Sequence, residues 1–183
     1  MNFWQELQSP RCVLTAIDDR AVRALLPFFE LPENLYFYLP TALISYDYES
    51  LKRELASWSD GLENLAWTIK DREGRILGLA NFEALDRDNG SVEMGLLLAD
   101  PETRGRGYGT EVARRLLSFA FVDLDLHRVS CRVMAGNEGS FALLSRLAFT
   151  HEGIARERIR RPDRYVDLHH FAILKEEWEG AYD

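Results

Sequence analysis

Cysteine is scarce in this chain of 183 residues, and so are proline and long apolar runs. The two cysteines, Cys12 and Cys131, stand far apart without a C-x-x-C pair, which argues against a disulfide framework or a cysteine-ligated zinc site. No stretch approaches about 18 uninterrupted apolar residues, so no membrane partner is expected. The first residues lack a basic segment followed by an apolar run, so no signal peptide is visible and we expect a cytoplasmic protein.

Positive charge is also in short supply. Lys plus Arg number 22 against 30 Asp plus Glu, which gives a net charge of −8. This balance argues against a nucleic-acid partner held by its phosphates and favours cationic or neutral small molecules. Residues 1–90 carry 9 basic and 15 acidic side chains, whereas residues 91–183 carry 13 and 15. Either a substrate mouth that attracts cations or ordinary surface charge would explain the bias.

Apolar residues, by contrast, make up 46% of the chain, with ten Phe, seven Tyr and four Trp, which is enough for a sizeable core. Without repeats or linkers, residues 1–183 are expected to form a single domain. Periodicity predicts the order β-α-α-β-β-β-α-β-α-β-β, and the strand–helix–strand succession over 91–134 indicates one parallel pair with a crossover. We therefore expect an α/β fold with a central mixed, mostly antiparallel sheet flanked by helices on both faces. The expected strands are 11–16, 65–70, 75–84, 91–98, 128–134, 152–160 and 164–174, and the expected helices are 20–28, 47–58, 107–123 and 137–147.

Alternate glycines stand between the strand at 91–98 and the helix that follows, in the segment Arg104-Gly105-Arg106-Gly107-Tyr108-Gly109-Thr110. Glycine lets the backbone approach a ligand closely, and the first amides of a helix face anions. Because Arg104 and Arg106 can add charged hydrogen bonds, the segment predicts a pyrophosphate site. It fits neither the nucleoside-triphosphate loop nor the dinucleotide fingerprint, whose third glycine would fall on Thr110. A tight connection without a ligand is the alternative interpretation.

The loop belongs to a longer pattern. Arg104, Gly107 and Gly109 fit the motif Gln/Arg-x-x-Gly-x-Gly/Ala, and Glu93-x-Gly95 precedes it on the strand. The pattern resembles the GNAT superfamily of acyl-CoA-dependent N-acyltransferases, in particular its branch of ribosomal-protein N-terminal and spermidine acetyltransferases. Downstream, Asn137-x-x-Ser140 and Leu147-Ala148-Phe149 parallel segments of the superfamily, with Ala148 in place of its usual Gly. Arg164-Tyr165-x-Asp167 resembles a segment of the branch.

The resemblance implies acetyl-CoA as co-substrate and a cleft where the parallel strands at 96–98 and 128–133 splay apart. Pantetheine would pair with the strand backbone as an added strand does, and the pyrophosphate would rest on the loop amides. Asn137 and Ser140 would lie beside the thioester arm. The cofactor-binding residues implied are Leu97, Leu98, Ala99, Arg104, Gly105, Arg106, Gly107, Tyr108, Gly109, Thr110 and Asn137.

Acyl transfer to an amine requires a base, because an ammonium group must lose a proton before it attacks. Glu93 is the candidate base, since strand alternation places it on the same face as Gly95 and Leu97. An exposed carboxylate paired with a neighbouring strand is its alternative interpretation. A strand N–H near Leu97 could stabilise the oxyanion. Many relatives carry a Tyr acid where this chain has Leu144, so the resemblance offers Ser140 as the acid, or as a residue that only satisfies a backbone group.

We therefore expect transfer of an acetyl group from acetyl-CoA to a primary amine, on a protein N-terminus, a polyamine or another small amine. A catalytically silent acyl-CoA-binding sensor is the alternative. A homodimer is allowed, although no interface can be identified. The four histidines lack metal-ligand spacing, so no metal is expected. The arginines at 156, 158 and 160 alternate onto one face of a strand, which favours a solvated hairpin over a nucleic-acid surface.

Overall fold

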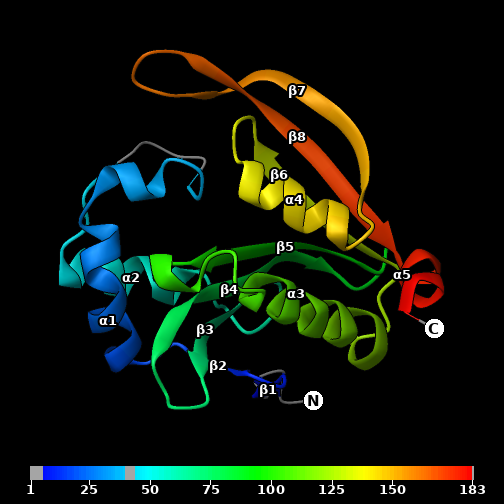
Figure 1. Ribbon diagram of the computed structural model, residues 1–183, viewed down its shortest axis with the longest axis horizontal. Coiled ribbons are helices and arrows are strands. Elements are labelled where there is room, and N and C mark those ends of the chain that lie inside the picture. Colours follow the sequence, from blue (N-terminus) through cyan, green and yellow to red (C-terminus); the bar gives the residue numbers. More distant parts are fainter. Residues whose placement is uncertain (1–5, 40–43, 183) are drawn as a thin grey trace.

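A computed structural model describes residues 6–39 and 44–182 (Figure 1). Eight strands form one sheet in the order β1-β2-β3-β4-β5-β6-β8-β7. Every neighbouring pair is antiparallel except β5 and β6, which run parallel, so the expected mixed, mostly antiparallel sheet is confirmed. The strands are β1 (Leu7–Gln8), β2 (Cys12–Ala16), β3 (Leu65–Asp71), β4 (Ile76–Asp86), β5 (Ser91–Leu98), β6 (Arg128–Met134), β7 (Thr150–Arg160) and β8 (Tyr165–Leu174).

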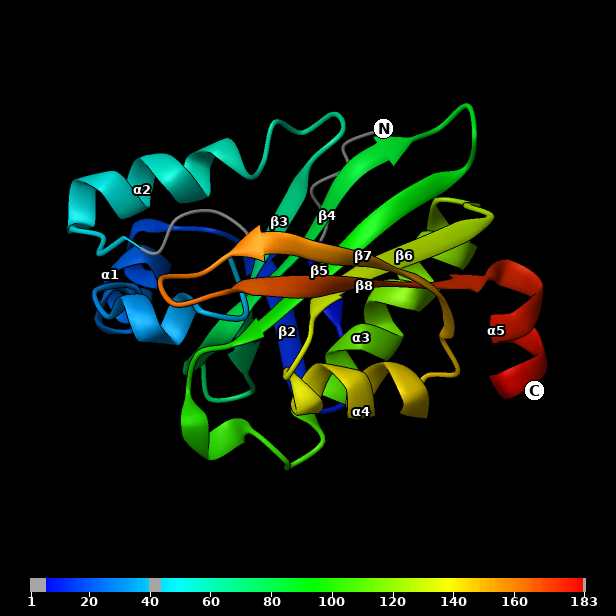
Figure 2. The same ribbon diagram turned by 90° about the horizontal axis from the view of Figure 1, so that it is seen from above.

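Helices cover both faces of this sheet, as expected (Figure 2). The short strand β1 and the last helix were not predicted; Glu177 caps that helix by accepting a hydrogen bond from the Leu174 amide at 2.8 Å. Among the helices of the described ranges, none has the length and apolar character needed to cross a membrane. The helical segments are α1 (Asp19–Phe29), η1 (Pro32–Leu35), α2 (Tyr48–Ser57), η2 (Pro101–Thr103), α3 (Tyr108–Ser118), its π-helical continuation η3 (Phe119–Asp123), α4 (Glu138–Arg146) and α5 (Lys175–Tyr182).

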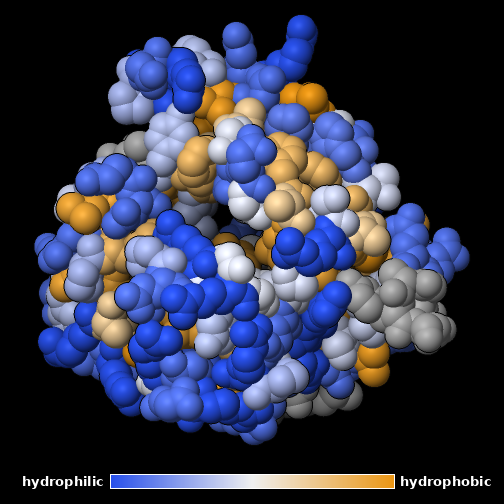
Figure 3. All heavy atoms as spheres, viewed as in Figure 1, coloured by the Kyte–Doolittle hydropathy of each residue, from blue (hydrophilic) through white to orange (hydrophobic). Residues whose placement is uncertain are grey.

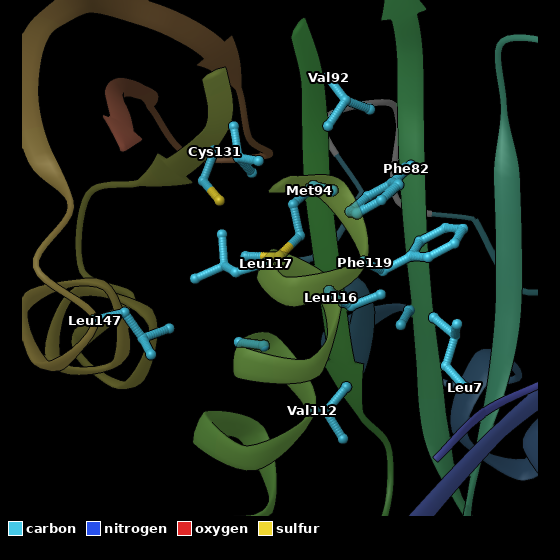
Figure 4. Packing of buried hydrophobic residues seen from close by; sticks show 14 of the residues in the cluster. Leu7, Phe82, Val92, Met94, Val112, Leu116, Leu117, Phe119, Cys131 and Leu147 are labelled. Carbon is cyan, nitrogen blue, oxygen red and sulfur yellow. The ribbon is translucent and has the colours of Figure 1, made fainter. Parts of the chain in front are cut away.

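Strand alternation divides the core into two layers. In β4, Leu79 packs into the cluster formed with α1 and α2, whereas its neighbour Ala80 and Phe82 pack into the cluster formed with α3 and α4. Phe82 stacks on Phe119 with ring centroids 6.1 Å apart. Figure 4 shows this layer, in which Met94 of β5 lies beside the helix formed by α3 and its continuation η3. The two layers hold the sheet between them and fix the strands that carry the site.

Near its start, at Gly78, β4 lies unusually close to β5. A Cβ built there would stand 1.8 Å from the carbonyl oxygen of Leu97, so the position requires glycine. The register of β3 and β4 shifts beside it and leaves Leu77 as a bulge residue. The Leu77 carbonyl accepts hydrogen bonds from the amides of Ala99 at 2.9 Å and Asp100 at 3.3 Å. These contacts fix where β5 ends and the glycine loop begins.

The parallel pair of β5 and β6 is short. Its register runs only from Ser91 opposite Arg128 to Glu93 opposite Ser130. Beyond that point β5 stays paired with β4, and β6 stays paired with β8. The sheet therefore divides between β5 and β6, as the resemblance implied.

Candidate active site

The turn between β5 and α3 leaves a row of main-chain amides without internal partners. Gly105 and Gly107 take φ values of +72° and +84°, in the left-handed region that favours glycine. Amides at the start of a helix, aided by its dipole, bind anions. Within the described ranges, no hydrogen bond leaves the amides of Gly105, Gly107, Tyr108, Gly109 and Thr110.

Two other amides of this loop are already occupied. The Arg104 amide donates to the Pro101 carbonyl at 3.2 Å, and the Arg106 amide donates to the Thr103 carbonyl at 3.4 Å. Both bonds belong to the short turn of η2. Of the amides expected to face a ligand, these two therefore already have internal partners.

The side chain of Arg104 also points back into the protein. Its Nε and Nη2 atoms donate to the Leu98 carbonyl at 3.2 and 3.1 Å. The guanidinium thus ties the loop to the last residue of β5. In this arrangement Arg104 positions the loop, whereas the sequence had suggested that it contacts the anion directly.

Arg11, in the turn before β2, braces the other side of the loop. It donates to Glu111 Oε2 at 2.6 Å and to the Arg106 carbonyl at 3.1 Å, and its Cζ lies 4.4 Å from the Tyr108 ring centroid. Burial would raise the pKa of Glu111, but hydrogen bonds from Ser9 and Arg11 outweigh it and the pKa is lowered. Sequence analysis missed Arg11, because its partners lie about a hundred residues away and no motif marks it.

An open cavity of about 740 Å³ adjoins the loop between the segment 8–11 and α3. Its lining combines Gly105 and Gly107 with the basic side chains of Arg114, Arg115 and Arg146. Arg146 reaches across from α4 and donates to Thr110 Oγ1 at 3.2 Å. Positive charge beside free amides suits a phosphate-bearing ligand.

Strand alternation decides which backbone groups of β5 face the divided part of the sheet. The Val92 carbonyl points toward β6, because it accepts the Ser130 hydroxyl at 3.3 Å. Backbone groups two residues apart point the same way along a strand. The main-chain groups of Leu96 and Leu98 therefore face the gap, beyond the last residue paired with β6.

The neighbouring residues face the opposite strand. The Ala99 amide donates to Leu77 on β4, and the Leu97 carbonyl points at Gly78 on the same strand. The backbone groups of Leu97 and Ala99 therefore face β4, away from the gap where pantetheine is expected. Leu98 keeps the orientation that pairing with pantetheine needs.

Four polar residues form a chain across the sheet near this gap. Glu93 on β5 stands directly opposite Glu83 on β4, and like charges in that position destabilise a sheet. Arg132 on β6 lies between them, with its Nε 2.6 Å from Glu93 Oε1 and its Nη2 3.7 Å from Glu83 Oε2. Asn81 completes the chain by donating to Glu83 Oε1 at 2.8 Å.

The environment of Glu93 favours proton uptake. Burial raises the pKa of its carboxyl group, the contact with Arg132 opposes that rise, and the charge of Glu83 adds to it. The structure thus contains the alternative expected for Glu93, a carboxylate paired with a neighbouring strand, here through Arg132. It also holds this carboxylate at the start of the gap, on the face that alternation predicted. Neither observation excludes the other.

Asn137 caps α4 by accepting the Ser140 amide on Oδ1 at 3.3 Å. Ser140 is half-buried in the first turn of that helix. Leu144, one turn further on, is buried in the core. The place where many relatives carry a Tyr is therefore filled by apolar packing. In the described residues, no group of three or more His, Cys, Asp or Glu side chains could hold a metal ion.

The fold and the site define an acetyltransferase of one family. A family model described as an acetyltransferase (GNAT) domain matches residues 11–150. The chain therefore belongs to the GNAT family of acetyltransferases.

Similar proteins agree with this assignment. A putative ribosomal N-acetyltransferase, YdaF of Bacillus subtilis, is 36% identical over 108 residues, which are 59% of this chain but only 58% of that protein. The N-acetyltransferase YoaA of the same organism is 26% identical over 92% of this chain and 96% of its own length.

Solved structures extend the comparison over nearly the whole chain. A putative acetyltransferase from T. thermophilus is 26% identical, with a TM-score of 0.82 over 96% of this chain and 92% of its own. A spermidine N-acetyltransferase from Vibrio cholerae, in complex with CoA and spermine, is 19% identical, with a TM-score of 0.81 over 92% and 98%. At that identity the likeness concerns the fold.

We predict that Gly95 and Asn81 are energetically coupled. A Cβ on Gly95 would stand 2.3 Å from Asn81 Oδ1, so Gly95→Ala must displace Asn81 and its bond to Glu83. We expect Gly95→Ala to lower the free energy of unfolding by about 1–3 kcal/mol and Asn81→Ala by about 1–3 kcal/mol. The double variant should lose clearly less than the sum, measured by urea denaturation. Gly153→Ala, where nothing lies within 4 Å, is the control, and strictly additive losses would contradict the coupling.

Proposed function

We propose that this chain transfers an acetyl group from acetyl-CoA to a primary amine, carried by a small molecule or by a protein N-terminus. The observation that carries the proposal is the row of free amides at the start of α3, directly after the gap between β5 and β6. A pyrophosphate supplies the anion that such a row binds. Membership of the GNAT family supports a CoA thioester as its bearer.

The pantetheine arm would lie along the exposed edge of β5. The amide and carbonyl of Leu96 and the amide of Leu98 can pair with it, as an edge strand pairs with an added strand, whereas the Leu98 carbonyl already accepts hydrogen bonds from Arg104. Asn137 and Ser140, at the start of α4, would flank the thioester from the other side. The Vibrio relative described with CoA and spermine supports the same use of this fold, although the two chains are only 19% identical.

In the proposed reaction the neutral amine nitrogen attacks the thioester carbonyl carbon. The carbon–sulfur bond breaks, CoA leaves as a thiolate, and the nitrogen gives up a proton. Glu93 would take the proton that the ammonium form of the acceptor loses before the attack, directly or through water, and its raised pKa favours this role; the proton that the nitrogen loses after the attack goes to the departing thiolate. An edge amide of Leu96 or Leu98 would donate to the oxyanion. Ser140 would protonate or contact the departing thiolate.

The acceptor is proposed to be cationic. Glu83 and Glu93 place two carboxylates against one guanidinium near the reacting centre, so the cluster attracts a further positive charge. Relatives named for ribosomal and spermidine acetylation support amine acceptors of this kind. A cytoplasmic location and a homodimer stay predictions from the sequence.

A second function is favoured by one observation. Leu144 is buried where many relatives carry a Tyr, which suits an acyl-CoA-binding sensor without turnover. Thiol release from acetyl-CoA, measured with spermidine, small amines, amine antibiotics and free N-terminal peptides, separates the two functions. We expect release with at least one amine. CoA binding without release on any of them would establish the sensor instead.

Cofactor affinity should depend on the backbone conformation at Gly107. Its φ of +84° disfavours any side chain, and the carboxylate of Gly107→Asp would repel the pyrophosphate. We expect calorimetry to show a Kd for CoA at least about tenfold weaker in this variant, because one charge–charge contact is worth that much. Gly153→Asp, on β7, should bind like the original chain. No heat with CoA from the unaltered chain would refute the proposal.

The acidic limb of the pH–rate profile should report the pKa of Glu93, since only its ionised form accepts a proton. Arg132 lowers this pKa and Glu83 raises it. We therefore expect Arg132→Gln to move the limb of kcat/KM to higher pH and Glu83→Gln to move it to lower pH. Glu93→Gln should abolish the limb.

The matched control for this profile is Arg128→Gln. Arg128 lies on the same strand as Arg132, but it pairs with Glu152. In Arg128→Gln the acidic limb of the kcat/KM profile should stay at the pH of the unaltered chain. An unchanged limb in Glu93→Gln would exclude Glu93 as the base, whereas shifts of equal sign in Arg132→Gln and Glu83→Gln would exclude the electrostatic explanation.

A further inference from the structure

The two parts of the divided sheet are joined again at their far end by Arg161. This residue lies in the turn between β7 and β8, where its amide donates to the Arg164 carbonyl at 2.8 Å. Turn arginines are normally solvated, but the side chain of Arg161 is only 3% exposed. The site described above does not account for this burial.

The guanidinium of Arg161 binds the main chain of the segment 36–39, which follows η1. Its Nη2 donates to the carbonyls of Tyr36 at 2.5 Å and Leu39 at 2.7 Å, and its Nε donates to the Tyr36 carbonyl at 3.1 Å. Its Cζ also lies 5.0 Å from the centroid of the Tyr36 ring. These contacts join residues more than 120 positions apart in sequence.

The same side chain is anchored on the β6 side of the gap. Its Nη2 lies 3.1 Å from the sulfur of Met134, the last residue of β6. Met134 belongs to a small separate core with residues of the β7–β8 hairpin. Gly136, with φ of +89°, lies nearby: a Cβ built on it would stand 3.7 Å from the Phe37 ring. The contacts of Arg161 bridge from the β6 side of the gap to the segment 36–39.

The segment 36–39 also lies close to the proposed reacting centre. Leu39 packs in the same cluster as Leu97 of β5. Tyr38 packs against this cluster too, and burial, with a smaller contribution from the charge of Glu83, raises the pKa of its hydroxyl. Figure 3 shows the molecular surface hollowed in the middle of this face, where Figure 1 places the gap between the η1 side, β5 and the start of α4.

We propose that Arg161 is a positioning residue that closes the open end of the gap and holds the segment 36–39 over the acceptor entrance. The proposal rests on the proposed acetyl transfer. An entrance narrowed by the segment 36–39 would admit an amine at the end of a slender, flexible chain, such as a small amine or an unfolded N-terminus.

Lysine is a suitable replacement for testing this role. It keeps the charge of Arg161, but one ammonium on a flexible stem cannot reproduce the planar fork that spans the carbonyls of Tyr36 and Leu39. We expect Arg161→Lys to raise the KM for the acceptor about tenfold, the value of one charge-assisted hydrogen bond, and to leave kcat and the KM for acetyl-CoA within about twofold. The probes are spermidine and a free-amine tetrapeptide.

Hydrogen exchange gives a readout that needs no turnover. Arg161→Lys should speed exchange of the amides in a peptide covering 30–39 and leave the glycine loop at 104–110 unchanged. Arg158→Lys, an exposed arginine on the same hairpin, should change neither the exchange nor the KM. Arg161→Gln serves as a second variant, with its melting temperature recorded.

The outcomes separate this inference from the proposed function. If exchange in 30–39 is faster in Arg161→Lys but no amine is turned over, the role of Arg161 in positioning the segment 36–39 stands and the acetyl transfer is refuted. Turnover with unchanged exchange and unchanged acceptor KM in Arg161→Lys would refute the closure and keep the acetyl transfer. A uniform loss of stability and kcat without a rise in acceptor KM would show a merely structural arginine and also overturn the proposal.

Discussion

The structure depends on the brevity of the pairing between β5 and β6. Three residues on each strand are in register, and then the strands part. Backbone groups in a protein interior need partners, so an unpaired inner edge is unstable unless something occupies it. The edge of β5 at Leu96 and Leu98 is therefore prepared for a ligand that can pair as a strand does. Since the edge lies inside the sheet and not at its border, it is also shielded from pairing with other chains.

The division of the sheet also explains the charge distribution beside it. Glu83 and Glu93 face each other on paired strands, where two carboxylates repel. The gap lets Arg132 reach both of them from β6. Its single charge leaves the cluster one negative charge in excess. A base that is buried, but only partly compensated by a cation, keeps a raised pKa. The ion pair and a catalytic role for Glu93 are therefore compatible.

Local patterns predicted most of the fold, because they report on local physics. Alternation and helical periodicity predicted the strands and helices from 11 to 174 in the correct order, and the glycines predicted the loop before α3. Contacts between distant residues leave no such pattern. Arg11 and Arg161 act on partners about a hundred residues away, and nothing near them in sequence distinguishes them from solvated arginines. The same limit affected Leu97 and Ala99, since their backbone groups face β4, and the strand that flanks β5 on that side is set by the tertiary fold. In β7, an irregularity between Ala155 and Ile159 likewise breaks the alternation expected for 156, 158 and 160.

Arginine occupies the places where the divided sheet lacks strand pairing. Arg104 holds the end of β5, Arg132 spans the gap near its origin, and Arg161 closes its far end. A guanidinium suits this task, because it carries five donors in a rigid plane at the end of a long side chain and can reach acceptors that two strands would otherwise satisfy. Side-chain bridges differ from a strand ladder in one respect, since each can open without disrupting the others. A sheet closed in this way can keep its core fixed while the segment over the acceptor entrance moves, which a continuous ladder between β5 and β6 would forbid.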